Sequence, residues 1–163
     1  MNKACGCSHG PLDMKVKYHS KDITKVQNIN IGDWTDLRCA EELDLKAGDF
    51  RFINLGISVE VPAGYEMHIA PRGSTFKNFG IIQVNSVGVL DESYSGDGDI
   101  VKMPALAMRD TKISIDDRIC QCRLVLKQPN VNWVEVDSLE NEDRGGFGST
   151  GVNEFVGNAK IIR

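Results

Sequence analysis

The glycine-rich run 144–151, Arg-Gly-Gly-Phe-Gly-Ser-Thr-Gly, holds the densest set of groups that could bind phosphate. Because glycine has no Cβ, the backbone N–H groups of such a run can converge on an anion. Arg144 adds a planar fork of donors that matches phosphate oxygens, and Ser149 and Thr150 add hydroxyl donors. The run predicts a polyphosphate-binding segment, with a flexible glycine-rich tail as the alternative.

A second segment, 85–96, combines groups that could recognise a base with a group that could activate water. Its pattern predicts a strand, a tight turn and a second strand. Asn85 can both donate and accept hydrogen bonds along one edge of a base. Asp91 is a candidate to hold and deprotonate a water molecule. The alternative is a plain hairpin with an aspartate on its surface.

Three shorter segments carry further candidates for binding phosphate and metal. Arg72 precedes a possible short helix at 74–78 and could bind phosphate together with the amides of that helix. Gln121 lies opposite the cysteine face of a predicted strand, from which it could reach a site. Asp36 could serve Mg²⁺ through water. The alternatives are a turn capped by Ser74 and an ordinary loop acid.

The 5 cysteines predict free thiols rather than a disulfide framework, because their number is odd and no secretion signal precedes them. Cys120 and Cys122 are expected to pack in the core, since their C-x-C spacing is tighter than the usual zinc pair. Cys5, Cys7 and His9 could hold a metal ion, but a loose chain end is the favoured interpretation.

The elements that would position these groups show a period of two. Alternating apolar and polar residues predict strands over 53–61, 65–69, 81–90 and 119–126, with one more around 131–136. Turn signals separate these runs, and no sustained helical period is present. Many short strands with such turns predict an all-β fold of the sandwich, jelly-roll or barrel kind.

A chain of 163 residues is long enough for one globular domain. Its expected parts are a flexible N-terminal extension at 1–13, a β-barrel domain at 14–140, and a glycine-rich arm and tail at 141–163. The net charge of -4 argues against binding along a nucleic-acid backbone. We expect no membrane insertion and a cytoplasmic protein, because apolar runs are short and residues 1–10 lack a signal-peptide core.

Together, the order and spacing of these segments resemble the motifs of the trimeric, all-β dUTPase family, and most closely its bacterial and bacteriophage members. The third and fifth motifs are the most specific, since both combine several fixed residues at fixed spacing. In order, the matching segments are 36–37, 71–74, Asn85 with 88–96, 118–121, and 144–151.

The resemblance implies a homotrimer of jelly-roll or β-barrel-like protomers with shared active sites. The first, second and fourth motifs would come from one subunit, the third from another, and the fifth from the last as a closing arm. The implied enzyme is a dUTP diphosphatase that uses Mg²⁺ to cut dUTP into dUMP and pyrophosphate. Asp91 would activate the water that attacks the α-phosphorus. Such an enzyme keeps uracil out of DNA and supplies dUMP for dTMP synthesis.

The resemblance also implies a role for each matching position. The uracil edge would be read by Asn85 and by the backbone around Val89 and Leu90, and Phe147 would stack over the base. Tyr94 would pack against the sugar and exclude a 2′-hydroxyl, and Asp36 would help to bind Mg²⁺ through water. The phosphate-binding positions would be Arg72, Gly73, Ser74 and Gln121, with Arg144, Gly148, Ser149 and Thr150 in the arm.

The sequence departs from the family pattern in a few places. Gly73 stands where the first serine of the second motif is expected, and Asp116 stands where a glycine usually precedes the fourth motif. The segment 95–103 is longer and more acidic than in many members. The alternatives to the dUTP diphosphatase are a regulatory, repressor-binding protein with the same fold and a dCTP deaminase-like enzyme.

Overall fold

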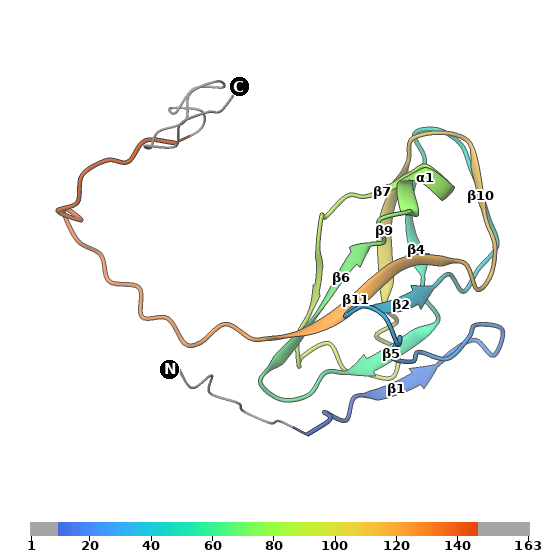
Figure 1. The fold of residues 1–163 in the computed structure, drawn as a ribbon, viewed down its shortest axis with the longest axis horizontal. Helices are drawn as coiled ribbons and strands as arrows, with labels where there is room; N and C mark the ends of the chain where they lie inside the picture. Colours follow the sequence, from blue (N-terminus) through green and yellow to red (C-terminus); the bar gives the residue numbers. More distant parts are fainter. Residues whose placement is uncertain (1–9, 147–163) are drawn as a thin grey trace, which may run out of the picture. The chain divides into compact units, whose positions relative to one another are not determined.

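The computed structural model describes residues 10–146, and its secondary structure is almost entirely β-strand (Figure 1). Contacts divide the chain into two units, Met1–Gln128 and Pro129–Arg163. The elements of the first unit are β1 (Lys15–Tyr18), β2 (Thr35–Arg38), β3 (Leu43–Leu45), β4 (Phe50–Asn54), β5 (Ile57–Glu60), β6 (Tyr65–Pro71), α1 (Thr75–Phe79), β7 (Ile81–Gln83), β8 (Gly88–Leu90), β9 (Lys102–Ala107), β10 (Thr111–Ile113) and β11 (Arg118–Leu126).

The strands form antiparallel sheets, which confirms the all-β prediction. The largest sheet has the order β2-β11-β6-β8, and a second sheet has the order β4-β9-β7. Two further pairs, β1-β5 and β10-β3, complete the first unit. Strands that are distant in sequence lie next to each other, so the sheet order brings the segments with candidate chemistry onto neighbouring strands.

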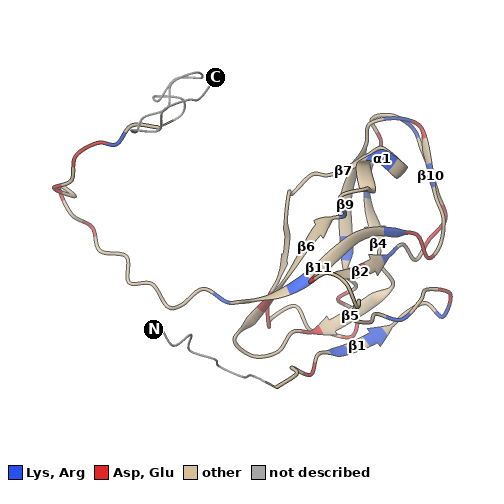
Figure 2. Cartoon of the chain, viewed as in Figure 1, with Lys and Arg blue, Asp and Glu red and all other residues tan. Residues whose placement is uncertain are grey.

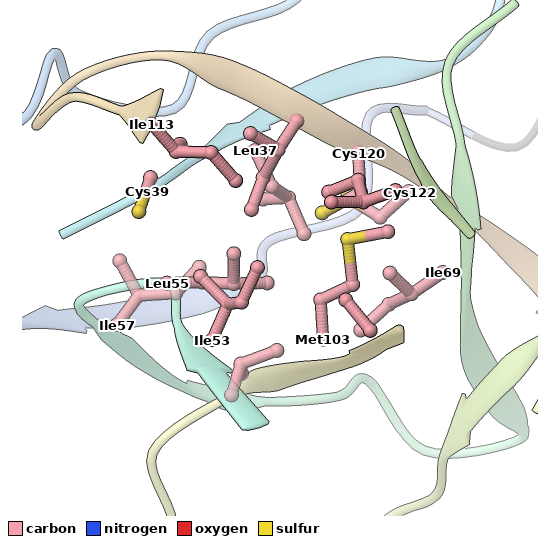
Figure 3. Close-up of a cluster of buried hydrophobic side chains, with 14 of the residues drawn as sticks. Leu37, Cys39, Ile53, Leu55, Ile57, Ile69, Met103, Ile113, Cys120 and Cys122 are labelled. Carbon is pink, nitrogen blue, oxygen red and sulfur yellow. The ribbon is translucent and has the colours of Figure 1, made fainter. Parts of the chain in front are cut away.

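The core lies between these sheets (Figure 3). Leu37, Ile53 and Met103 are among its fully buried side chains and come from β2, β4 and β9. Cys120 and Cys122 are buried free thiols in the same cluster, as predicted. Burial raises the pKa of Cys122 to about 12, so this thiol stays protonated and inert.

Two of the predicted strands are each divided between two sheets. The run 53–61 supplies β4 and β5, because the chain turns at Gly56, whose φ is 69°. The N–H of Gly56 donates to the side chain of Asn54 at 2.7 Å and fixes this turn. The run 81–90 likewise supplies β7 and β8, with Ser86 between them in a left-handed conformation. A period of two reports which face is buried, not which sheet a strand joins.

Other expectations can be compared directly with the structure. The predicted strands at 65–69 and 119–126 are confirmed as β6 and β11, and the predicted short helix as α1. The predicted hairpin over 85–96 is wrong, because β8 pairs with β6 and no strand follows it within that segment. The strand expected around 131–136 is also wrong, since no strand lies between β11 and the end of the described residues.

The turn before β11 shows how the chain accommodates Asp116. This residue has a φ of 72°, in the left-handed region where glycine is the usual choice. Its carboxylate accepts hydrogen bonds from the N–H and the hydroxyl of Thr24, at 2.6 and 2.8 Å, and from Arg38 at 3.0 Å. Desolvation raises the pKa of Asp116, but the bonds from Thr24 and the charge of Arg38 outweigh it and lower the pKa.

We expect stability to fall in the order wild type, Asp116→Gly, Asp116→Ala. Both variants lose the carboxylate bonds, at a cost of about 1–3 kcal/mol. Alanine adds about 1 kcal/mol or more because its Cβ disfavours the left-handed region. Urea denaturation at one protein concentration measures both differences. A glycine variant more stable than wild type would contradict this order and show that relief of the left-handed backbone outweighs the lost carboxylate bonds.

Candidate active site

The first group of candidate residues is an ion-pair cluster on adjacent strands. Arg72 follows the last residue of β6, Arg118 begins β11, and Asp36 lies in β2. Asp36 accepts from Arg72 Nε at 2.6 Å through one carboxylate oxygen and from Arg118 Nη1 at 3.1 Å through the other. The Asp36 side chain is only 15% exposed, whereas that of Arg118 is 52% exposed. Asp36 therefore holds two guanidinium groups together at one edge of the sheet.

Ser74 and Gln121 lie beside this cluster. The Arg72 guanidinium approaches the Ser74 hydroxyl at 3.5 Å. The Gln121 amide donates to the carbonyl of Pro71 at 3.2 Å. In β11, Gln121 pairs with Asp36 of β2 on one side. The structure thus brings together the phosphate-binding positions predicted from the second and fourth motifs.

Thr75 anchors the segment that carries Arg72, and sequence analysis gave it no role. It is only 1% exposed. Its hydroxyl accepts from the backbone N–H of Arg72 at 2.9 Å and donates to the carbonyl of Ile119 at 2.8 Å. The hydroxyl of Ser74 at the N-cap position makes no capping bond, so the alternative of a turn capped by the Ser74 side chain is not supported. The position of Thr75 directly after the predicted phosphate-binding segment was the one sequence feature that could have indicated this anchoring role.

Gly73 is not required by the backbone. Its φ lies outside the left-handed region, and a Cβ built at this position meets no atom within 4 Å. A serine side chain would therefore fit here without moving its neighbours. The glycine leaves the Arg72 cluster with one hydroxyl fewer than the family pattern provides.

A second group surrounds a pocket of about 500 Å³. Asn85, Val89, Leu90 and Tyr94 all line it, as their predicted roles require. The Tyr94 hydroxyl donates to the carbonyl of Ile100 at 3.1 Å, which fixes the ring at the pocket wall. The pocket wall also contains residues to which the sequence gave no role, namely Phe52, Ile69, Gly88, Ile100, Lys102 and Pro104. An apolar pocket with a few polar groups suits a base and its sugar.

Asp91 follows β8 directly and is solvent-exposed. One of its carboxylate oxygens accepts from the hydroxyl of Ser93 at 2.5 Å and from the N–H of Ser93 at 2.8 Å. The hydroxyl bond, the backbone bond from Ser93 and the charge of Lys127 lower the pKa of Asp91. Asp91 is therefore ionised at neutral pH, the form that a proton acceptor needs.

The two groups lie far apart within one chain. Leu90 of β8 pairs with Met67 of β6, five residues before Arg72. At about 3.3 Å per residue, the strand places Arg72 roughly 17 Å beyond the level of Leu90, and Asp91 continues in the other direction. A single chain therefore does not bring Asp91 to the Arg72 cluster.

The second unit carries the remaining candidates. Arg144 is exposed and lies outside any helix or strand. Phe147, Gly148, Ser149 and Thr150 lie outside the described residues. Within the part of the chain that is described, no group of three His, Cys, Asp or Glu side chains could hold a metal ion.

Charges of both signs are interspersed over the described chain (Figure 2). None of the helices formed by residues 10–146 has the length and hydropathy to cross a membrane.

Comparisons with known proteins show what the chain is similar to. A sequence profile of the dUTPase family matches residues 35–151. The chain is 52% identical over 140 residues to the SPbeta prophage-derived deoxyuridine 5'-triphosphate nucleotidohydrolase YosS of Bacillus subtilis, covering 86% of this chain and 99% of the relative. It is 39% identical over 122 residues to the deoxyuridine 5'-triphosphate nucleotidohydrolase of Finegoldia magna, covering 71% of this chain and 82% of the relative.

Solved structures with the same fold include phage and bacterial dUTPases. The Staphylococcus bacteriophage 80alpha dUTPase with dUPNHPP matches with a TM-score of 0.71 and 20% identity, covering 86% of this chain and 99% of that one. A mutant dUTPase from phage phi11 of S. aureus, described with a structural Mg(II) ion, has a TM-score of 0.66 and 15% identity over 80% of this chain and 100% of that one. These identities establish the fold alone.

Proposed function

The chain belongs to the dUTPase family, and on that premise we propose that it hydrolyses dUTP to dUMP and pyrophosphate. The observation that carries the proposal is the neighbourhood of Leu90 and Asp91. Leu90 lines a pocket of a size suited to a nucleoside, and the next residue is an ionised carboxylate. A base held in the pocket would leave its phosphates near a group that can accept a proton from water.

In the proposed reaction, Asp91 accepts a proton from a water molecule whose oxygen attacks the α-phosphorus. The bond from the α-phosphorus to the bridging oxygen breaks, and pyrophosphate leaves. Arg72 supplies guanidinium donors to phosphate oxygens on which charge develops, and Asp36 keeps that guanidinium oriented. The amide of Gln121 and the hydroxyl of Ser74 would add neutral donors beside it.

Selectivity is assigned to the pocket walls. Asn85 can pair with the edge of uracil, and a base with the opposite donor pattern would leave the amide of Asn85 unpaired. Tyr94 is fixed by its bond to Ile100, so its ring has little freedom to move aside for a ribose 2′-hydroxyl. The pocket therefore favours a deoxyuridine nucleotide.

Magnesium is proposed to arrive with the triphosphate. The described residues hold no acidic cluster for a metal ion, and the oxygens of Asp36 are engaged by Arg72 and Arg118. Each carboxylate oxygen keeps a second lone pair, so Asp36 still fits a water-mediated role, with phosphate oxygens as the direct ligands. When bound, Mg²⁺ would neutralise phosphate charge and assist departure of pyrophosphate.

The distance between Arg72 and Asp91 supports a homotrimer with shared sites, because a complete site then needs groups from different copies. An exposed apolar surface on the sheet β4-β9-β7 agrees with this proposal. Phe50 and Phe52 on β4 are 50% and 59% exposed and pack edge to face. Phe52 and Pro104 also line the nucleoside pocket, so a second copy docked on this surface would lie at the pocket mouth.

The glycine-rich run is proposed to close over the triphosphate and exclude water. Deleting residues 144–163 is expected to leave the fold of the first unit intact and to lower kcat by about 10²-fold or more, since positioning groups contribute on that scale. Circular dichroism and pyrophosphate release measure the two effects. A fully active truncation would contradict the closing-arm role.

The test of the proposed function is pyrophosphate release from dUTP, with dCTP, dTTP and UTP in parallel, with and without Mg²⁺. Release from dUTP alone that depends on Mg²⁺ is the expected result. Deamination of dCTP would instead support the deaminase-like alternative. No release from any nucleotide by a folded trimer would favour the regulatory, repressor-binding alternative.

The domain boundaries at 14–140 and 141–163, a protein partner and a cytoplasmic location stay predictions.

A further inference from the structure

Asp91 lies in a short turn whose other residues have no assigned role. The family motif fixes the aspartate and the tyrosine that follows it by three positions, and here Glu92 and Ser93 occupy the positions between them. Both make specific contacts. The carboxylate of Glu92 accepts from the N–H of Gly64 at 2.7 Å and from Lys127 Nζ at 3.0 Å, which ties the turn to the residue before β6 and the residue after β11.

The contacts of Ser93 are to the carboxylate of Asp91 itself. Its hydroxyl and its N–H both donate to the same oxygen, Oδ1, at 2.5 and 2.8 Å. A carboxylate oxygen offers two lone pairs, so Oδ1 is saturated by these two donors. The N–H of Tyr94 also favours the ionised carboxylate, but no hydrogen bond from the described residues reaches Oδ2 of Asp91. The two oxygens of the proposed proton acceptor are therefore not equivalent.

We propose that Ser93 is a positioning residue for Asp91. Ser93 holds Oδ1 of the carboxylate, so that Oδ2 faces the attacking water and accepts its proton. This inference rests on the proposed function. As the water oxygen bonds to the α-phosphorus, its proton passes to Oδ2 and pyrophosphate leaves with the electrons of the broken P–O bond. Holding one oxygen also fixes the rotation of the carboxyl group, so Oδ2 is oriented before substrate binds.

The charged groups around Asp91 define what else acts on its titration. Lys127, which directly follows β11, favours the ionised form, whereas desolvation opposes it. Glu66 and Glu92 are the other charged residues that line the same surface hollow. The hydroxyl bond from Ser93 is the largest of the causes that lower the pKa of Asp91. Removing that hydroxyl should therefore raise the pKa of Asp91 while the neighbouring charges stay in place.

The variant Ser93→Ala is expected to lower kcat for dUTP by about 10-fold with KM nearly unchanged, because the acceptor oxygen is misplaced. The acid limb of the pH profile of kcat should move to higher pH. Ser93→Thr keeps the hydroxyl and should restore both. Ser95→Ala is the matched control, since it removes an exposed hydroxyl from the same loop without a bond to Asp91. Wild-type kcat and an unmoved acid limb in Ser93→Ala would overturn the proposal.

A measurement without nucleotide separates this inference from the proposed function. An NMR titration of the Asp91 carboxyl carbon follows its pKa in the wild type and in Ser93→Ala. A higher pKa in the variant is expected, and an equal pKa would overturn the assignment of the hydroxyl bond. Failure of the wild type to hydrolyse dUTP would instead reject the proposed function, while the titration would still report on the contact.

Discussion

Replacing Asp91 with asparagine is expected to lower kcat for dUTP by about 10²–10⁴-fold, the usual contribution of a positioned general base. Asparagine has nearly the same shape and can still accept the bonds from Ser93 through its amide oxygen. It cannot take a proton from water, so binding should persist while turnover is lost. Calorimetric binding of dUTP to the variant, together with pyrophosphate release, measures the two quantities separately.

Asp97→Asn is the matched control for this substitution. Asp97 is an exposed acid in the following loop, where it pairs with Lys17 at 2.9 Å. Removing its charge should leave kcat within about 2-fold, since exposed ion pairs contribute little. Equal losses in both variants would mean that net charge, and not proton transfer at Asp91, governs the rate. In the wild type, the lowered pKa of Asp91 keeps its carboxylate ionised at a lower pH than usual. Activity should therefore persist at pH values below the usual pKa of an aspartate.

The sequence predicted the class of the fold because alternation over β6 and β11 is strong and unbroken. It failed where a turn lies inside an apolar run. Leu55 is buried, so the alternation of apolar and polar residues shows no break there. The chain nevertheless turns at Gly56 and enters another sheet. The strand predicted around Trp133 was wrong for another reason. Its exposed apolar residues resemble a strand, but they pair with no other strand within the described chain.

The sequence named candidate residues for the site but not the residues that hold them in place. Arg72, Gln121 and Asp91 follow from motif order, whereas Thr75 and Ser93 act through hydrogen bonds that depend on the folded turn. Their residue types are too common to stand out in a sequence. The departures at Gly73 and Asp116 show the same limit, because only the structure reveals free space at one and compensating bonds at the other.

A mixture of inactive variants provides the sharpest test of the shared site. Arg72→Ala and Asp91→Asn should each be nearly inactive alone, because each site then lacks a phosphate ligand or its base. If each site takes Arg72 and Asp91 from different copies, random reassembly of an equal mixture restores a site whenever both contributors are intact. That condition holds for about one quarter of the sites, so about one quarter of wild-type activity should return.

The two arrangements also differ when the changes lie in one chain. Wild-type chains mixed equally with the double variant Arg72→Ala/Asp91→Asn should keep about one quarter of the activity if sites are shared, and about one half if each chain holds a whole site. The separate variants should recover no activity in the second case. Size-exclusion chromatography must show that every mixture assembles. The shared arrangement is favoured by the register of β6 and β8. This register places the Arg72 cluster roughly 17 Å from the level of Leu90.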